Sequence, residues 1–103
     1  MATKYDLRLL PVAEEDFSEI INFIAFESLQ GAETVASRIE TGLMELMEFP
    51  YLGRVPAEPQ LMAAGFRYLV LDNYLIFYSI EENLVLVHRI LHCSRNYLKI
   101  LGQ

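Results

Sequence analysis

The spacing of apolar residues changes once along this chain, and this change constrains the fold more than any other feature of the sequence. Between residues 12 and 47, apolar positions recur at intervals of three and four residues, which is the period of an amphipathic helix. From residue 66 to residue 92, the pattern follows the two-residue period of β-strands. The sequence therefore predicts helices first and a meander of strands afterwards.

Turn-forming and capping residues divide these two regions into shorter elements. Pro11 cannot continue a strand ladder but suits the first turn of a helix, and Gln30-Gly31 interrupts the helical pattern. Three prolines and a glycine break any period between residues 49 and 65. The predicted elements are a strand over 5–10, helices over 12–29 and 32–47, a loop over 49–65, strands over 66–71, 74–80 and 84–92, and a short C-terminal helical turn capped by Ser94.

This order of elements predicts an α+β fold over residues 1–103, taken as a single domain. An N-terminal strand, a two-helix hairpin and a three-stranded antiparallel meander are expected to form one sheet with the helices on one face. A chain of 103 residues suffices for one core and is too short for two ordinary domains. Because the strands are apolar on both sides, the other face is expected to meet the C-terminal tail, a ligand or a partner.

Composition excludes several classes of protein. The single Cys93 cannot form an internal disulfide, and the chain shows neither a signal-peptide pattern nor an apolar run near the ~18 residues of a membrane helix. A cytoplasmic location without membrane contact is expected. No phosphate-binding loop, dinucleotide-binding glycine pattern or paired-cysteine motif occurs, so neither a cofactor nor a metal ion is expected.

The charge of the chain is acidic and unevenly distributed. The formal net charge is −6, which disfavours a nucleic-acid partner because a phosphate backbone rewards Lys and Arg. Residues 1–64 carry four basic and eleven acidic residues, whereas residues 65–103 carry four basic and three acidic residues. This asymmetry predicts an acidic solvated layer and a mildly basic working surface.

Two arginines on predicted strands, Arg67 and Arg89, are candidates for binding phosphate. Neither has an acidic residue within its own strand, and a pair of guanidinium groups on one face of a sheet would match the oxygens of a phosphate. The alternative is that each arginine forms a salt bridge with the acidic helices.

His92 is the preferred candidate for proton transfer, because it ends a predicted strand and imidazole titrates near neutral pH. His88 is predicted on the same face, ~13 Å away by strand rise, which is too far to share a metal ion. Cys93 is disfavoured as a nucleophile because no His–acid arrangement surrounds it. Tyr97 is the preferred aromatic residue for stacking on a base, although strand aromatics are more often core residues.

Five segments, in their order and spacing, resemble the RelE/ParE superfamily of bacterial type II toxin–antitoxin toxins, also called plasmid stabilisation proteins. The segments are Tyr5–Leu9, Phe49–Arg54, Phe66–Val70, Tyr74–Tyr78 and Val87–His92, the last followed by Arg95. The resemblance implies a growth-inhibiting toxin that a cognate antitoxin neutralises. RelE-like members cleave mRNA on the ribosome, and ParE-like members inhibit DNA gyrase without being nucleases.

The RelE-like mechanism, an endoribonuclease acting on ribosome-bound mRNA, is the first functional prediction. By the family pattern, Arg67 and Arg89 would hold the scissile phosphate and His92 would act as general acid or base. Arg54, Arg95 and Tyr97 would contact the substrate, and Glu58 is a guess for the second proton-transfer group.

Two alternatives are carried beside this mechanism. A gyrase inhibitor would use the helical hairpin and the C-terminal tail as protein-contact surfaces. A degenerate, non-toxic member would retain only antitoxin binding or self-association as a homo-oligomer.

Overall fold

The computed structural model describes residues 4–102 and contains the predicted order of elements with one additional helix, α3. The elements are β1 (Asp6–Leu9), α1 (Pro11–Glu27), α2 (Leu29–Glu48), α3 (Pro59–Ala63), β2 (Arg67–Leu71), β3 (Tyr74–Glu81), β4 (Leu84–His92) and α4 (Tyr97–Leu101). The predicted α+β class is confirmed, and the bounds of the last strand agree with the prediction.

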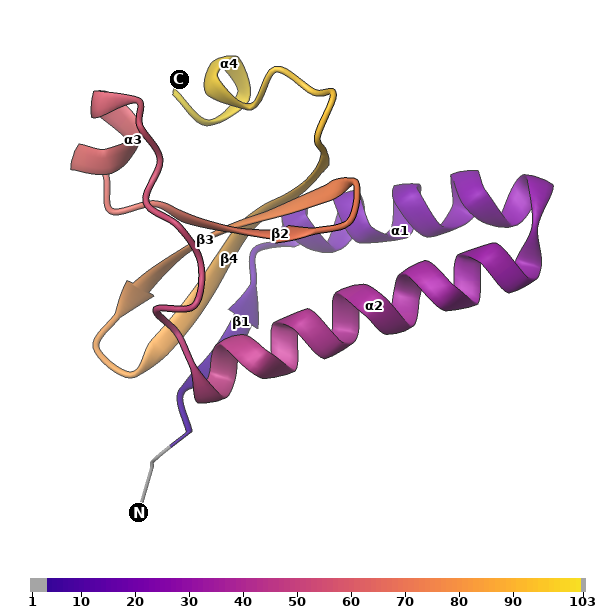
Figure 1. Cartoon of the computed structure of the whole chain (residues 1–103), viewed down its shortest axis with the longest axis horizontal. Coiled ribbons are helices and arrows are strands. Elements are labelled where there is room, and N and C mark those ends of the chain that lie inside the picture. Colours follow the sequence, from indigo (N-terminus) through magenta and orange to yellow (C-terminus); the bar gives the residue numbers. More distant parts are fainter. Residues whose placement is uncertain (1–3, 103) are drawn as a thin grey trace.

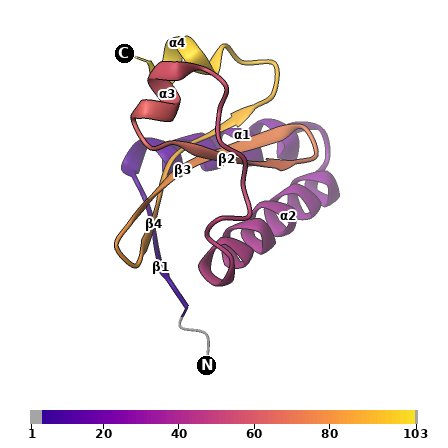
Figure 2. The same cartoon turned by 60° about the vertical axis from the view of Figure 1, so that its left-hand side comes forward.

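The strands form one sheet in the order β1-β4-β3-β2. β1 pairs with β4 in parallel, and the two hairpins β2–β3 and β3–β4 are antiparallel, so the sheet is mixed. The hairpin of α1 and α2 packs on one face, here called the helix face, whereas α3 and α4 lie on the side of the sheet away from α2, here called the far face (Figure 1; Figure 2). No helix among residues 4–102 is long and apolar enough to cross a membrane.

The core lies between the helical hairpin and the helix face. It is built from buried residues that recur at helical spacing in α1 and α2 and at every second position in β3 and in the first half of β4. These residues include Ala13, Ile39, Leu43, Leu46, Ile76, Tyr78, Val85, Val87 and Ile90. The burial pattern explains why one period change along the sequence predicted the class of fold.

Three local predictions were wrong, each because a side chain or a proline acts differently from expectation. The break between the helices lies at Ser28, whose hydroxyl accepts a hydrogen bond from the N–H of Gly31 at 2.9 Å. The predicted loop over 49–65 contains α3, which begins at Pro59. The side chain of Asn96, not that of Ser94, caps the last helix.

A β-bulge in β4 changes the face to which its last residues point. Tyr78 pairs with Val87 and Phe77 pairs with Arg89, so His88 is an extra residue in the ladder. After the bulge, the alternation shifts by one position. The prediction that His88 and His92 share a face is therefore wrong.

The segment that follows α2 is fastened to the sheet by a buried tyrosine. The hydroxyl of Tyr78 donates a hydrogen bond to the carbonyl of Pro50 at 2.7 Å and accepts one from the N–H of Gly53 at 3.0 Å. Tyr78 is fully buried. Water therefore cannot replace either hydrogen bond without a structural change.

We expect Tyr78→Phe to lower the free energy of unfolding by about 2 kcal/mol, because it leaves the Pro50 carbonyl and the Gly53 N–H buried without partners. Tyr74→Phe is the control, since the Tyr74 hydroxyl forms no hydrogen bond within residues 4–102. Urea unfolding of both variants measures the difference, and equal midpoints would contradict this role of Tyr78.

Candidate functional site

Arg89, one of three predicted catalytic residues, is held in an ion pair with α1. Its Nε and one terminal nitrogen donate hydrogen bonds to the two carboxylate oxygens of Asp16, at 2.7 and 2.9 Å. Asp16 is only 8% exposed, and the carboxylate raises the pKa of Arg89 further above its ordinary value. The salt-bridge alternative is therefore what the structure shows for this arginine.

The carboxylate of Asp16 also accepts a backbone hydrogen bond at the edge of β4, where a neighbouring strand would otherwise do so. β1 ends at Leu9, so the second half of β4 has no neighbour on that edge. The N–H of Ile90 points to this edge and donates to Asp16 at 3.1 Å. One side chain thus satisfies a backbone donor and a guanidinium at the position where the parallel pairing stops.

Arg67 is engaged by backbone carbonyls of the segment that follows α2. One of its terminal nitrogens donates to the carbonyls of Tyr51 and Gly53, at 3.0 and 2.7 Å, and its guanidinium lies 5.3 Å from the centre of the Tyr51 ring. Its Nε is buried without a hydrogen-bond partner among the described residues. Arg67 therefore fixes the backbone of the segment from Tyr51 to Gly53 against β2.

The expectation that Arg67 and Arg89 converge on one face is wrong. Arg67 is paired with Tyr78, and Arg89 is paired with Phe77. Because neighbouring residues of a strand point to opposite faces, the two arginines leave the sheet on opposite sides. The bulge at His88 produces this arrangement, and it is not visible in the sequence.

His92, the third predicted catalytic residue, is hydrogen-bonded to Ser94 in the turn that follows β4. Its Nδ1 accepts a hydrogen bond from the N–H of Ser94 at 3.0 Å and lies 2.8 Å from the Ser94 hydroxyl. The ring meets Tyr74 edge-on, with 5.4 Å between the ring centroids. Only Nε2 is then available to an outside group.

A group of polar and aromatic side chains gathers on the far face. We call this group the aromatic face, and its members are Arg54, Glu58, Tyr68, Phe77 and Tyr97. The phenol of Tyr97 donates to the carboxylate of Glu58 at 2.7 Å, which raises the pKa of Tyr97. Phe77 lies between Tyr97 and Tyr68, with ring centroids 5.1 and 5.9 Å away. Arg54 pairs with Tyr68 through two backbone hydrogen bonds of 2.8 and 2.9 Å.

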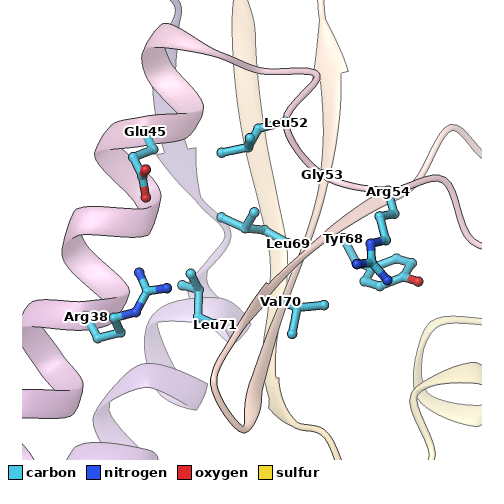
Figure 3. A pocket seen from close by; sticks show the side chains of 9 residues that line it. All are labelled: Arg38, Glu45, Leu52, Gly53, Arg54, Tyr68, Leu69, Val70 and Leu71. Atoms are coloured by element: carbon cyan, nitrogen blue, oxygen red, sulfur yellow. The ribbon is translucent and has the colours of Figure 1, made fainter.

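The aromatic face brings together two of the six predicted site residues, Arg54 and Tyr97, with the guessed Glu58. Figure 3 shows Arg54 and Tyr68 on the same side of β2, away from Leu71. Arg95 lies exposed in the turn before α4, and its side chain forms no hydrogen bond or ion pair within residues 4–102. Sequence reasoning did not place Phe77 here, although its alternation with Tyr78 is a signal for the far face.

A recess beside the outer edge of β2 is the feature drawn in Figure 3. Its volume is about 280 Å³, and α2 contributes Arg38 and Glu45 to its wall. Arg38 reaches Asp72 with 3.7 Å between the charged atoms, and the two side chains are 44% and 73% exposed. Arg54 and Tyr68 of the aromatic face also line this recess, together with Leu52, Gly53, Leu69, Val70 and Leu71. No group of three or more metal-binding side chains occurs in the described part of the chain.

His88 lies on the far face in a partly buried setting. Its Nε2 is 2.8 Å from the hydroxyl of Ser79, and its ring meets Phe66 edge-on with 4.8 Å between centroids. Burial lowers the pKa of His88, and the nearby Glu81 opposes this shift only in part. The fold therefore favours the neutral imidazole.

Comparisons with known proteins identify a family from the sequence and a shared fold from solved structures. The family model described as ParE toxin of type II toxin–antitoxin systems, parDE, matches residues 7–97. A solved structure of the chromosomal ParDE toxin–antitoxin system from Pseudomonas aeruginosa is similar with a TM-score of 0.71 at 17% identity, covering 87% of this chain and 97% of that one.

A second solved structure has the same fold. The toxin–antitoxin complex RelBE2 from Mycobacterium tuberculosis is similar with a TM-score of 0.62 at 20% identity, covering 86% of this chain and 98% of that one. At these identities the likeness to the two structures establishes the fold alone. Comparison with curated protein sequences found no match.

We expect Asp16→Asn to lower the free energy of unfolding by about 2–4 kcal/mol, because it leaves the half-buried Arg89 without its counter-charge. Glu15→Gln removes the same charge from an exposed neighbour on α1 and is the matched control, with an expected change below ~0.5 kcal/mol. Thermal and urea unfolding measure both variants. Equal stability of the two would show that the ion pair is not a structural requirement.

We expect stability to decrease on acidification from neutral pH partly because of His88. Its pKa in the folded state is below the ordinary value of about 6.5, so below neutral pH the unfolded chain binds more protons than the folded chain. The His88 contribution is therefore complete above about pH 7 and decreases as the pH falls through the unfolded value. Urea unfolding between pH 7 and pH 5 should give a shallower dependence for His88→Gln, whereas His92→Gln, which leaves His88 in place, should retain it.

Proposed function

This chain belongs to the ParE toxin family of type II toxin–antitoxin systems, and from that premise we propose that it inhibits DNA gyrase through protein contacts and does not cleave RNA. A cognate antitoxin neutralises it. Its target places its action in the cytoplasm. The proposal replaces mRNA cleavage, the first functional prediction from sequence, by the mechanism that was carried as its alternative.

The observation that carries the proposal is the engagement of the three predicted catalytic residues within the fold. A ribonuclease of the predicted kind needs two arginines and an imidazole around one phosphate. Here the carboxylate of Asp16 binds Arg89, backbone carbonyls bind Arg67, and Ser94 binds His92. This arrangement supports a mechanism that does not depend on phosphate chemistry.

The surface of the helical hairpin supports a protein target. Phe23, Phe26 and Leu29 are 76%, 93% and 74% exposed, which is unusual for large apolar side chains near one another in the sequence. The net charge of −6 also suits a protein partner better than ribosomal RNA. A contact of this kind buries apolar area and needs no catalytic group.

The antitoxin partner is supported by the structures that this chain resembles. One is a ParDE toxin–antitoxin system, and the other is a RelBE2 toxin–antitoxin complex. Both solved chains are covered almost completely by the match. A similar pairing is therefore proposed for this chain.

RNA cleavage remains a second candidate because of the aromatic face. Glu58 and Tyr97 form a hydrogen-bonded acid–phenol pair, and Arg54 lies beside the neighbouring Tyr68. In this candidate, Glu58 would accept a proton, Arg54 would contact phosphate and Tyr97 would stack on a base. The candidate differs from the first sequence prediction because it does not use Arg67, Arg89 or His92.

We expect the purified chain to inhibit DNA supercoiling by gyrase and to leave cell-free translation of a reporter mRNA unchanged, because the proposed contacts are made with a protein. Arg54→Ala and Glu58→Gln, which alter the aromatic face, should inhibit supercoiling as the unmodified chain does, within about twofold. Inhibited translation with cleaved mRNA, abolished by Glu58→Gln, would contradict the proposal and support the second candidate.

A further inference from the structure

A groove runs between α1 and the end of β4, apart from both the aromatic face and the recess beside β2. Its volume is about 460 Å³. Ile20, Phe23 and Ile24 form its wall on α1, at the spacing of one helical stripe, and Tyr74 and His92 form its wall on the sheet. Ile20 of this stripe also packs against the core, whereas Phe23 is largely exposed at the groove.

The outer part of the helical hairpin extends beyond the sheet. Figure 1 shows α1 and α2 continuing past the turn between β2 and β3, so the sheet does not cover their far ends. Phe23 at the groove is 76% exposed, and Phe26, one turn further, is 93% exposed. Burying such side chains in a complex is favourable because it removes apolar area from water.

The sheet wall of the groove offers unpaired backbone groups. β1 ends opposite Val87, and beyond it the N–H of Ile90 is taken by Asp16. By the alternation of the β3–β4 ladder, the carbonyl of Ile90 and the N–H of His92 point to the same outer edge. Outside that ladder, no hydrogen bond to either group is present within residues 4–102.

The charge around the groove is acidic. α1 contains no lysine or arginine, and Glu19 lines the groove directly. The carboxylates of Glu14 and Glu15 precede it on exposed positions of the same helix. Arg89 of β4 does not offset this charge, because its guanidinium is already paired with Asp16 of α1. A partner of complementary charge must therefore be basic at this position.

We propose that this groove is the docking site of the antitoxin, and that the docking segment places a large apolar side chain between α1 and Tyr74 with a Lys or Arg opposite Glu19. The inference rests on the proposed function and adds the location and the chemistry of the partner. The apolar side chain would bury the exposed ring of Phe23. The backbone of the segment would pair with Ile90 and His92 at the open edge of β4.

A second copy of this chain fits the groove less well than such a segment. A symmetric pair would bring two α1 helices together, and each carries several carboxylates and no lysine or arginine. Like charges across an interface oppose association. A basic segment of another protein meets the same surface with attraction instead.

The test uses the purified protein encoded by the reading frame adjacent to the toxin gene as the probe. Its dissociation constant is measured by calorimetry for the unmodified chain and for Phe23→Ser and Glu19→Lys. We expect each variant to weaken binding at least tenfold. Binding to the unmodified chain should also weaken as the NaCl concentration rises, because a charge pair contributes to it.

Matched controls lie on α2, which does not line the groove. Met44→Ser removes an exposed apolar side chain, and Glu40→Lys reverses an exposed charge. Both should bind within twofold of the unmodified chain. Phe23 and Glu19 are exposed, so circular dichroism and thermal unfolding should show that their variants are folded.

Three results would overturn the inference in distinguishable ways. If the probe binds all four variants equally, the antitoxin docks elsewhere and the proposed function stands. If the unmodified chain sediments as a dimer and Phe23→Ser as a monomer, the groove holds a second copy. If the probe neither binds the unmodified chain nor relieves its growth arrest, the docking site and the proposed antitoxin partner fail together.

Discussion

The carboxylate of Asp16 is the point on which the arrangement of this molecule depends. It joins the first helix to the last strand by three hydrogen bonds, two to the guanidinium of Arg89 and one to the N–H of Ile90. It acts where the short β1 has ended, so the N–H of Ile90 at this edge of β4 is paired with a side chain instead of with backbone. The position of α1 over the sheet follows from this contact and from the core below it.

The bulge at His88 separates the chemistry of the two faces. Before the bulge, Val85 and Val87 point into the core, and after it Ile90 does so. His88 is therefore directed to the far face, and His92 to the groove beside α1. A regular strand would have placed both imidazoles on one side. One extra residue in the ladder thus decides which residues can act together.

The molecule presents surfaces for contact more clearly than a centre for catalysis. The ionisable strand residues that suggested phosphate chemistry are used to hold elements together, whereas large apolar side chains on α1 remain exposed. Aromatic side chains also gather beside α4, where Glu58 holds the phenol of Tyr97. Exposed apolar area on an acidic helix is the feature that supports the proposed action on a protein target.

The sequence by itself determined the order of most elements and the α+β class, because hydrophobic period, prolines and turn residues act over a few neighbouring positions. The superfamily was indicated by the resemblance of five segments to known toxins. The sequence did not reveal the presence of α3 or the β-bulge at His88. The partners of Arg67 and Arg89 were decided only by the tertiary structure. Asp16 is 73 residues from Arg89 along the chain, and no local pattern connects the two. Whether a charged side chain is free to act depends on such distant contacts, and therefore on the folded chain.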